Sequence, residues 1–408
     1  MKCNGCYKDS ADSYCRRCRQ QLFDGNNISH ILEFDPPLAD NLSLYQEKTK
    51  RLSISGVQLK YSLRFEGKKL VLTDTGGQYI IKPIPPAVQL AEANQAPENE
   101  HLTMQIASQL YGINTAANGI IYFKDGTPAY ITRRFDLRPD GSKYLQEDMA
   151  QISNRSRQRN GENFKYEGTY EEIGLLIKKY VPASMPALEN YFRIVIFNYL
   201  VSNGDAHLKN FSLIQGDMGD QLLSPAYDLL NTFIHVPGET DTALQLYNGD
   251  IDAPFYSVYG FYGQESFREL GRKIGLLPQR IERILTQLLS KNEELLEMIR
   301  NSSLADRVKQ QYIERVNDKI RRMGMTPTMI SRRMNSEFPG VYAPTTKLAI
   351  LNFLAGKQLK GYFQYTKDSP ELQKDNKYTF VDLSKPDDID IIDGDALTAI
   401  HDVEDQTL

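Results

Sequence analysis

The segment NYLVSNGDAHLKNFSLI (residues 198–214) constrains the fold most, because it places several polar side chains between two apolar runs. The apolar residues leading into it recur at spacings of three and four, which predicts a helix that ends at the Asn-Gly pair. Asp205 and Asn210 follow on a loop. Two short apolar runs around the turn QGDMGD then predict a hairpin that leads to Asp228. This order can bring Asp205, Asn210 and Asp228 together at one end of the hairpin.

Two carboxylates and an amide in this arrangement are typical of phosphoryl transfer. One carboxylate orients the acceptor hydroxyl and accepts its proton, while an amide oxygen and the second carboxylate hold Mg²⁺ on the nucleotide phosphates. We therefore predict Asp205 as the general base, with Asn210 and Asp228 as the Mg²⁺ ligands. Lys209 would neutralise charge on the transferred group. The alternative is a polar loop that caps helices through Asx hydrogen bonds.

The chain before this loop favours the first interpretation. Lys82 ends the β-prone run GGQYIIKP, and Glu100 lies on the next predicted helix, residues 96–112. A phosphate-binding lysine and its orienting glutamate are expected at these two places in a kinase. By its position, His207 is counted among the ATP-binding residues, although a histidine in such a loop most often holds the loop by hydrogen bonds.

The pattern along the chain predicts an α+β fold in five parts. These are a zinc knuckle (1–24), a Pro-punctuated linker (25–44), a β-rich lobe with one helix (45–135), a mainly helical lobe (136–324) and a β-containing module with an acidic tail (325–408). The run GIIYFKDGTPAYITRRFD predicts a hairpin, because two β-prone runs flank an Asp-Gly turn. Amphipathic stretches in the fourth part predict helices.

The four cysteines all lie near the N-terminus. Cys3, Cys6, Cys15 and Cys18 form the pattern C-x2-C-x8-C-x2-C. Two CxxC turns are a common way to hold one tetrahedral Zn²⁺, while two disulfides or a redox pair are the alternatives. Four thiolates would close the site, so the zinc would be structural. We expect its removal to loosen residues 1–24 with little effect on the two lobes.

Bulk composition limits the classes of protein. A net charge of −4 argues against a generally basic nucleic-acid binder, although a local patch is compatible with it. No apolar run approaches a membrane span in length, and the first residues lack the apolar region of a signal peptide. We therefore expect a cytoplasmic protein with no membrane partner.

Seven segments, in order, resemble the HipA family of toxin kinases. They are SISGVQLK (53–60), IIKP (80–83), ENEH (98–101), RRFD (133–136), QEDMAQ (146–151), NGDAHLKNFSL (203–213) and SPAYDLL (224–230). The resemblance implies a two-lobed, protein-kinase-like (HipA-like) fold and the phosphorylation of Ser or Thr on a protein with ATP and Mg²⁺. Known targets in this family are aminoacyl-tRNA synthetases. A small helix-turn-helix antitoxin that binds operator DNA restrains the kinase, so any DNA binding would be indirect.

The same resemblance implies further nucleotide contacts. Arg134 and Phe135 belong to a segment that would line the adenine through backbone groups. The loop RLSISGVQLK would cover the phosphates with Ser55, Gly56, Val57 and Gln58. Ser53 and Ser55 look like the autophosphorylation sites of HipT-type members. A phosphoserine brings a charge of about −1.5 to −2, which would repel nucleotide or move the loop outward.

The sequence departs from the family pattern at three points. Only the cysteine segment and linker stand where other members have a sizeable N-terminal subdomain. In this respect the sequence is similar to the shortened HipT-type kinases, in which the missing subdomain is a separate small protein. Arg133 replaces the acidic residue expected before RFD. Residues after 325 extend beyond the usual kinase end.

Other functions are compatible with parts of the pattern. Asp205, His207 and Asn210 also match the D-x-H-x-x-N loop of phosphoinositide kinases, so a lipid or small-molecule kinase is one alternative. A pseudokinase that serves as a zinc-knuckle adaptor is another. Against the pseudokinase, all five polar residues expected of an active kinase are present: Lys82, Glu100, Asp205, Asn210 and Asp228. The basic stretch NRSRQR (154–159) is expected to be a solvated loop, with a contact to substrate or tRNA as its alternative.

Overall fold

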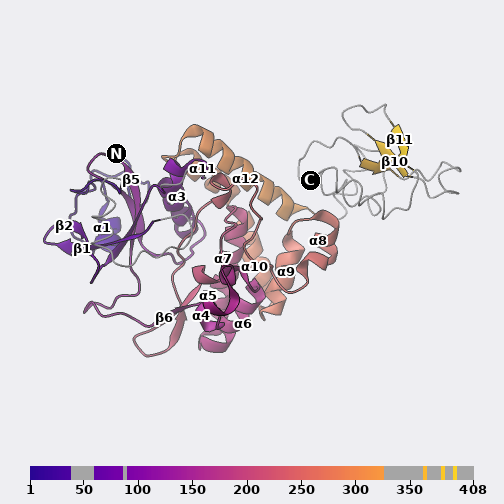
Figure 1. The fold of residues 1–408 in the computed structure, drawn as a ribbon, viewed down its shortest axis with the longest axis horizontal. Coiled ribbons are helices and arrows are strands. Elements are labelled where there is room, and N and C mark those ends of the chain that lie inside the picture. Colours follow the sequence, from indigo (N-terminus) through magenta and orange to yellow (C-terminus); the bar gives the residue numbers. More distant parts are fainter. Residues whose placement is uncertain (38–58, 86–89, 326–361, 365–377, 382–388, 393–408) are drawn as a thin grey trace. The chain divides into compact units, whose positions relative to one another are not determined.

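The computed structural model of the chain describes residues 1–37, 59–85, 90–325, 362–364, 378–381 and 389–392. These residues form two compact units. The first comprises residues 1–248 and 270–320, and the second contains the remaining described residues. The predicted β-rich lobe and most of the predicted helical lobe lie in the first unit, where a sheet-containing part is followed by a mainly helical part (Figure 1). Residues 249–269 and 321–324 of the predicted helical lobe belong to the second unit.

The β-rich lobe is built on a five-stranded antiparallel sheet with the strand order β2-β1-β3-β5-β4. Its strands are β1 (Tyr61–Glu66), β2 (Lys69–Leu72), β3 (Tyr79–Pro83), β4 (Asn118–Tyr122) and β5 (Pro128–Arg133). The predicted hairpin is β4–β5. In its turn, Thr127 N donates to Asp125 Oδ1 at 2.8 Å, and Gly126 has a φ of +88°, which favours glycine. Lys82 is the penultimate residue of β3, which extends one residue beyond the predicted end, to Pro83.

The cysteine segment packs onto this sheet. Helix α1 (Arg16–Phe23) follows the third cysteine, and its Phe23 shares one hydrophobic core with Tyr79 of β3. Residues 30–34, which the sequence assigned to a linker, run beside β4, where Leu32 N donates to Tyr122 O at 2.8 Å. The first 34 residues therefore contribute to the core of the β-rich lobe.

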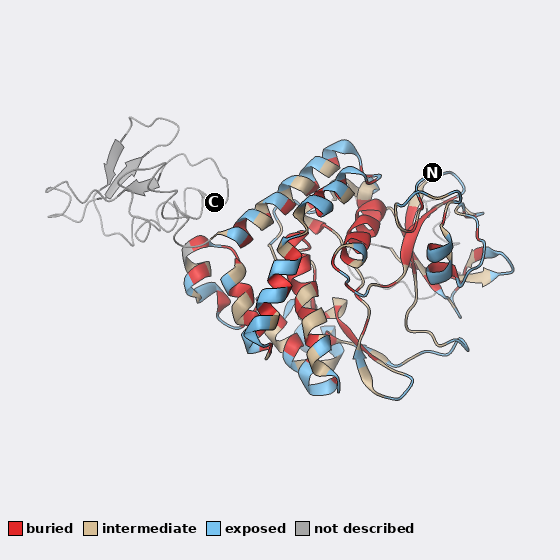
Figure 2. Cartoon of the chain, turned by 180° about the vertical axis from the view of Figure 1, so that it is seen from behind, coloured by how far each residue is buried: buried red, intermediate tan, exposed pale blue. Residues whose placement is uncertain are grey.

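Helix α3 (Ala96–Gln109) is buried along most of its length (Figure 2). It lies against β4 and β5, and its buried polar side chains reach the helical lobe. Asn99 Nδ2 donates to Asn231 O at 2.9 Å, and the hydroxyls of Thr103 and Tyr312 are 2.8 Å apart. Because α3 is held from both lobes, the position of Glu100 on it is fixed.

The helical lobe surrounds α7, the helix predicted before the Asn-Gly pair. Its helices are α4 (Met149–Ile152), α5 (Arg157–Asn160), α6 (Tyr170–Tyr180), α7 (Ser184–Leu200), α9 (Gln264–Lys273), α10 (Pro278–Leu289), α11 (Asn292–Arg300) and α12 (Asp306–Gly324). A three-stranded antiparallel sheet combines β6 (Gln146–Asp148) with the predicted hairpin of β7 (Ser212–Gln215) and β8 (Gln221–Leu223). This hairpin separates the loop of Asp205 from the loop of Asp228.

The second unit contains α8 (Pro254–Tyr259) and a three-stranded antiparallel sheet of β9 (Tyr362–Gln364), β10 (Tyr378–Val381) and β11 (Ile389–Ile392). Strands were predicted in this part of the chain.

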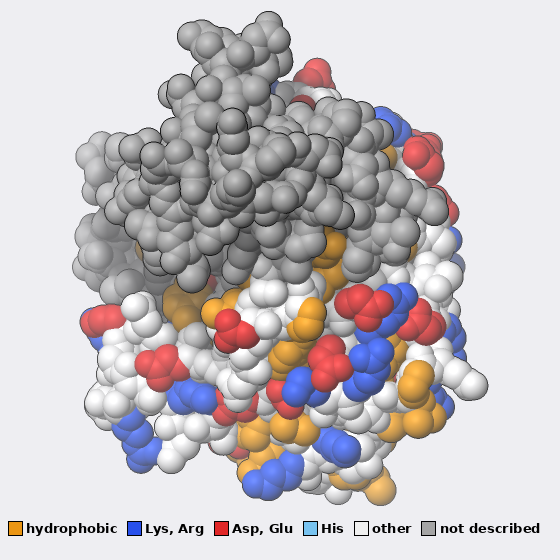
Figure 3. Space-filling view, turned by 90° about the vertical axis from the view of Figure 1, so that its right-hand side faces the viewer, with side chains coloured by type: hydrophobic (Ala, Val, Ile, Leu, Met, Phe, Trp, Pro, Cys, Tyr) orange, Lys and Arg blue, Asp and Glu red, His pale blue; other side chains and the backbone are white. Residues whose placement is uncertain are grey.

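On the face shown in Figure 3, cationic and anionic side chains are interspersed, in keeping with the near-neutral composition. Among the described residues, no helix combines the length and the apolar character needed to cross a membrane.

Candidate active site

Three charged residues meet where the two lobes face each other. Lys82 Nζ donates to Glu100 Oε1 of α3 and also to Asp228 Oδ1 of the helical lobe. The side chains of Lys82 and Glu100 are 5% and 0% exposed, and that of Asp228 is 22% exposed. Residues from β3, α3 and the loop after β8 therefore form one ionic cluster, at the positions predicted for a kinase.

The pKa values in this cluster follow from burial and pairing. Burial opposes the charge on Lys82, but Asp228 and Glu100 outweigh it and raise the pKa of Lys82. Burial also opposes the charge on Asp228, yet Lys60 and Lys82 hold the pKa of this carboxyl well below its usual range. Burial raises the pKa of Glu100 against the opposing effect of Lys82. The buried Lys82 is therefore a counter-charge shared by two carboxylates, and Lys60 adds a second positive charge at Asp228.

Asp228 Oδ2 has two further partners. Lys60 Nζ lies 3.3 Å away, and Asn210 Nδ2 donates to the same oxygen at 3.1 Å. The Asn210 amide oxygen accepts from His207 N at 3.0 Å, so the amide turns its nitrogen toward Asp228. A carboxylate and an amide this close supply the oxygen ligands that Mg²⁺ prefers, provided that the Asn210 amide presents its oxygen to the ion. Asn210 and Asp228 are thus the residues that would hold it.

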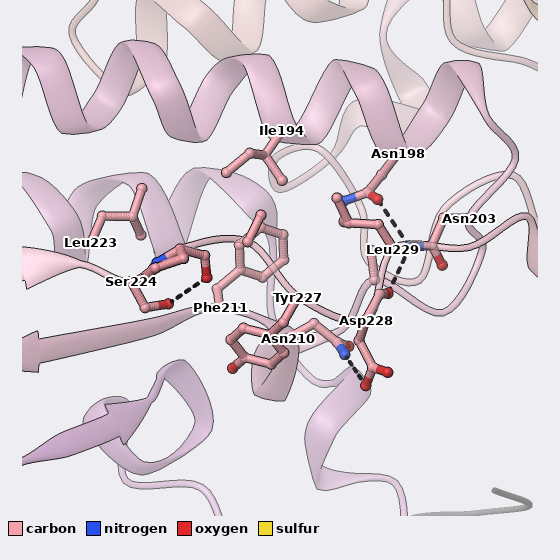
Figure 4. Close-up of a pocket in the computed structure, with 13 residues that line it drawn as sticks. Ile194, Asn198, Asn203, Asn210, Phe211, Leu223, Ser224, Tyr227, Asp228 and Leu229 are labelled. Carbon is pink, nitrogen blue, oxygen red and sulfur yellow. Dashed lines mark hydrogen bonds between the residues drawn. The ribbon is translucent and has the colours of Figure 1, made fainter. Parts of the chain in front are cut away.

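The backbone around Asp228 is held in an unusual conformation. Asp228 has a φ of +60°, in the left-handed region that Asp tolerates better than most residues. Asn203 Nδ2 donates to Asn198 Oδ1 at 2.9 Å and to Asp228 O at 3.4 Å (Figure 4). The end of α7 therefore connects the loop of Asp205 to the loop of Asp228 through side-chain amides.

Asp205 lies on the loop after α7, with its side chain 47% exposed. Its Oδ1 accepts a hydrogen bond from the Tyr166 hydroxyl at 2.6 Å. His207 is buried beneath it, with Nε2 3.9 Å from Asp205 Oδ2. Burial lowers the pKa of His207 to about 4, so its ring is neutral at pH 7. A neutral, buried ring fits the loop-holding role better than a role in binding phosphate charge.

Lys209 lies beside a carboxylate that the sequence had not linked to it. Its Nζ lies 3.1 Å from Asp148 Oδ2, and Asp148 is the N-cap of α4. Lys209 therefore connects the short helix after β6 to the loop of Asp205. In this position its charge is paired with a carboxylate.

Gly204, immediately before Asp205, allows a close approach of two chain segments. A Cβ at this position would lie 2.5 Å from Thr240 O and 2.7 Å from the Glu239 carboxyl carbon. Only glycine fits here without a shift of the loop that carries Asp205.

Two adjoining cavities surround this cluster. One, of 210 Å³, is lined by Lys82, Glu100 and the segment 133–136 that leaves β5. Within that segment Arg134 forms an ion pair with Asp136, and the ring of Phe135 lies 5.6 Å from that of Tyr227. This cavity is the candidate nucleotide site.

The second cavity, of 330 Å³, is lined by Asp205, Asn210 and Asp228 together with Tyr166 and Glu239. It shares Lys60 and Asp228 with the first cavity. Because it contains the exposed carboxylate of Asp205, it is the candidate site for the phosphate acceptor. The structure thus brings Asp205, Asn210 and Asp228 to one cleft, as the hairpin pattern predicted.

Four ATP-binding candidates and both autophosphorylation candidates lie outside the described residues. They are Ser55, Gly56, Val57 and Gln58, and Ser53 and Ser55. Their roles stay predictions. The loop's last residue, Lys60, is described.

The four cysteines converge on one point. Their sulfur atoms all lie within 4.8 Å of one another, close to the spacing of about 3.8 Å expected around a tetrahedral zinc. Cys15 N and Gly5 N point at Cys3 Sγ, at 3.1 and 3.4 Å. A Cβ on Gly5 would lie 2.8 Å from Cys18 Sγ, so only glycine fits beside the sulfur atoms.

The thiols also influence one another. Hydrogen bonds with Cys18 and Cys6 lower the pKa of Cys3, and hydrogen bonds with Cys3 and Cys6 raise the pKa of Cys18. One ionised thiol therefore opposes the ionisation of the next, and a divalent cation would compensate this repulsion. The donor set and its spacing fit a structural Zn²⁺.

Sequence reasoning missed three residues of the site. Lys60 was quoted within SISGVQLK but given no role, and its only local signal is its place at the start of β1. Asp148 was quoted within QEDMAQ without being linked to Lys209. Tyr166 lies outside every quoted motif. Each acts on a partner at least 39 residues away in the chain, which no local pattern indicates.

The β-rich lobe carries the buried pair of Lys82 and Glu100. The helical lobe presents Asp205 and the candidate metal ligand Asp228 to the same cleft. This arrangement defines a two-lobed, kinase-like protein. The HipA-like C-terminal domain family model matches residues 52–296, and the chain belongs to this family. A protein of Haemophilus influenzae named "Putative kinase" is 28% identical over 309 residues, which are 72% of this chain and 88% of that protein.

Two further relatives agree in fold or sequence. The serine/threonine-protein kinase toxin HipA of Shewanella oneidensis is 24% identical over 267 residues, 61% of this chain and 58% of that protein. The structure of HipA from the same organism, solved with HipB and operator DNA, has a TM-score of 0.51 at 20% identity. The match covers 67% of this chain and 65% of that one, so the chain spans less than two thirds of these two proteins. The family match and these relatives support a kinase of the HipA family.

Proposed function

We propose that the chain is an ATP-dependent Ser/Thr protein kinase of toxin–antitoxin type. The observation that carries the proposal is the meeting of Lys82, Glu100 and Asp228 beside Asn210, in a cleft that also holds Asp205. The cluster supplies a cation for phosphate and two oxygen ligands for Mg²⁺. The adjoining cavity supplies an exposed carboxylate for the acceptor. These are the parts that phosphoryl transfer needs.

In the proposed mechanism, Asp205 accepts the proton of the acceptor hydroxyl while that oxygen attacks the γ-phosphorus, and the bond from this phosphorus to the ADP oxygen breaks, so that ADP leaves. Lys82, oriented by Glu100, neutralises charge on the nucleotide phosphates, and Lys60 is placed to assist it. Mg²⁺ held by Asn210 and Asp228 would further neutralise the phosphate charge. The segment that includes Arg134 and Phe135 would line the adenine. Lys209 would neutralise charge on the transferred group, and His207 would hold the loop of Asp205 in place.

The proposal extends to the substrate and the partners. We propose that the acceptor is a Ser or Thr of a translation-related protein, such as an aminoacyl-tRNA synthetase, and that Ser53 or Ser55 is autophosphorylated. The Shewanella HipA was solved with HipB and operator DNA. This supports a small helix-turn-helix antitoxin as a partner, with DNA bound through it. A separate protein similar to the N-terminal subdomain is a second proposed partner, and the proposed compartment is the cytoplasm.

The test is phosphopeptide mass spectrometry of the purified chain after incubation with Mg-ATP, beside Asp205→Asn. We expect phosphate on Ser53 or Ser55 in the wild type and none in Asp205→Asn, with equal thermal midpoints for the two proteins. Phosphate on neither protein would argue against autophosphorylation. If added tRNA synthetases also stayed unmodified, the protein-kinase proposal would be overturned in favour of a pseudokinase adaptor or a kinase of small molecules.

A further inference from the structure

Tyr166 occupies the position that the mechanism reserves for the acceptor. Its hydroxyl donates to Asp205 Oδ1 at 2.6 Å. A general base has to lie at hydrogen-bond distance from the proton that it removes, so a substrate hydroxyl needs the same carboxylate. The phenol and the acceptor therefore compete for one hydrogen-bond position.

The phenol is suited to donate rather than to react as a base. Burial, and then the neighbouring Asp205, raise the pKa of Tyr166, so the hydroxyl keeps its proton at neutral pH. Its ring meets that of His207 edge to face, with centroids 5.3 Å apart, and Lys165 Nζ lies 4.7 Å from the ring centre. The contact with Asp205 is thus a charge-assisted hydrogen bond with a defined direction.

Tyr166 belongs to a surface segment, residues 155–168 (the strap). Both ends of the strap lie next to Glu172 of α6. At its start Arg155 binds Glu172 of α6 with two hydrogen bonds, of 2.7 and 2.9 Å. At its end Gly168 has a φ of +132°, and a Cβ there would lie 2.7 Å from Glu172 Oε2. Glycine at this point lets the chain pass close to the same carboxylate.

Between these ends the strap is weakly held. It contains the four-residue helix α5 and a single 3-10 turn, Phe164–Tyr166. Tyr166 itself is 39% exposed. A short, exposed segment with few buried contacts opens at low free-energy cost compared with the core. The strap can therefore move while α6 and α7 stay in place.

We propose that Tyr166 is a built-in occupant of the acceptor position, so that the strap restrains phosphoryl transfer until Tyr166 leaves Asp205. This regulation rests on the proposed function, because it takes Asp205 as the base. Tyr166 lines the acceptor cavity, whereas the residues that line the candidate nucleotide cavity do not include it. The restraint therefore acts on the acceptor and leaves nucleotide binding unchanged.

The test is the hydrolysis of Mg-ATP by the full chain, with water as the acceptor. Water attacks the γ-phosphorus, the bond to the ADP oxygen breaks, and Asp205 takes up a proton from the water. Replacing Tyr166 with Phe removes the competing hydroxyl and keeps the ring. We expect Tyr166→Phe to raise kcat about tenfold or more, the net effect of one hydrogen bond to a charged group, with no change in the KM for ATP.

A matched control is Tyr180→Phe. Tyr180 is 41% exposed, has a lysine beside its ring as Tyr166 does, and ends α6 outside both cavities. We expect it to match the wild type. Asp205→Asn should abolish hydrolysis in both the wild-type and the Tyr166→Phe background, which shows that the gain passes through Asp205.

The outcomes separate the two proposals. An unchanged or lower kcat in Tyr166→Phe, with an active wild type, would overturn the restraint alone, because the phenol would then be neutral or would help to position the base. Hydrolysis in Tyr166→Phe but not in the wild type would support both. If all variants bind Mg-ATP without hydrolysis or transfer, the proposed function itself fails, and the restraint fails with it.

Discussion

Lys82 and Lys60 both contact Asp228 but differ in what surrounds them. Lys82 is 5% exposed and also binds Glu100, whereas the side chain of Lys60 is 26% exposed and lies 3.3 Å from Asp228 Oδ2. A buried charge that loses its partner costs far more than one that water can reach. The two lysines should therefore differ in their effect on stability.

The first prediction compares Lys82→Met with Lys60→Met. Lys82→Met leaves the buried carboxylate of Glu100 without its counter-charge, which should cost about 3–5 kcal/mol of unfolding free energy. Lys60→Met should cost about 1 kcal/mol or less. Thermal and urea unfolding of the two variants measure this difference. Equal losses would show that the buried Glu100 does not depend on Lys82.

Glu98, two residues before Glu100, is a second buried carboxyl group. Its carboxyl is 3.5 Å from the Tyr7 hydroxyl of the knuckle, and burial raises its pKa to about 7. Between pH 4.5 and 7 the folded chain therefore binds a proton that the unfolded chain has lost. Because the bound proton favours the folded state, the contribution of Glu98 to the unfolding free energy falls as the pH rises through that window, and the loss is complete above pH 7.

The second prediction is that Glu98→Gln removes this penalty. Relative to the wild type, the variant should gain on the order of 2 kcal/mol at pH 8 and little at pH 5. Unfolding of both proteins at the two pH values isolates the contribution of this one group. A difference between the proteins that stays constant with pH would contradict the assignment.

At the residue scale, the sequence predicted the residues of the ionic cluster but not all of their contacts. Lys82, Glu100 and Asp228 could be found because each follows a strand, helix or hairpin signal. Lys60 and Tyr166 could not, since their partners lie 168 and 39 positions along the chain. Such pairings depend on how the lobes pack, and a local pattern does not encode that.

At the scale of elements, α1 and the knuckle behave as part of the β-rich lobe. Tyr14 OH donates to Ile120 O at 2.6 Å, Ile120 N donates to Asn4 O at 2.9 Å, and Gln109 Nε2 of α3 donates to Cys6 O at 3.0 Å. The cysteine spacing predicted the metal ligands but contained no signal for the surface on which the knuckle docks. The shared core replaces the expectation of a knuckle that loosens alone.

The third prediction follows from these contacts. Removal of zinc with a chelator, or Cys18→Ser, should raise amide hydrogen exchange in β4, β5 and α3 as well as in residues 1–24. The two strands share one core with the knuckle, and α3 is hydrogen-bonded to it. Exchange in α10 and α11 should stay unchanged and serves as the internal control. A rise confined to residues 1–24 would restore the picture of an independent knuckle.

Helices and hairpins of the lobes were the elements most accessible from sequence. The two β-prone runs around Asp125-Gly126 and the apolar stripe of α7 are local signals, and both elements form, although α7 ends at Leu200, before the Asn-Gly pair predicted to end it. The segment 30–34 was missed because its pairing with β4 is a single-strand contact without a periodic pattern.

At the scale of the whole chain, α3 joins the two lobes. It contacts Asn231 and Tyr312 of the helical lobe through Asn99 and Thr103, and the knuckle through Glu98 and Gln109. Glu100 lies on the same helix and orients Lys82. The nucleotide site therefore depends on the packing of the β-rich lobe as a whole, and the helical lobe supplies Asp205 and Asp228.

The roles proposed for Asp205 and Asp228 are best tested by a titration of ATP binding with and without Mg²⁺ for the wild type, Asp205→Asn and Asp228→Asn. The account predicts that Asp205→Asn binds Mg-ATP as the wild type does but transfers no phosphate. Asp228→Asn should lose at least about tenfold of the Mg²⁺-dependent affinity, because it removes a charged metal ligand. Full Mg²⁺-dependent binding by Asp228→Asn, or transfer at the wild-type rate by Asp205→Asn, would contradict the central claim.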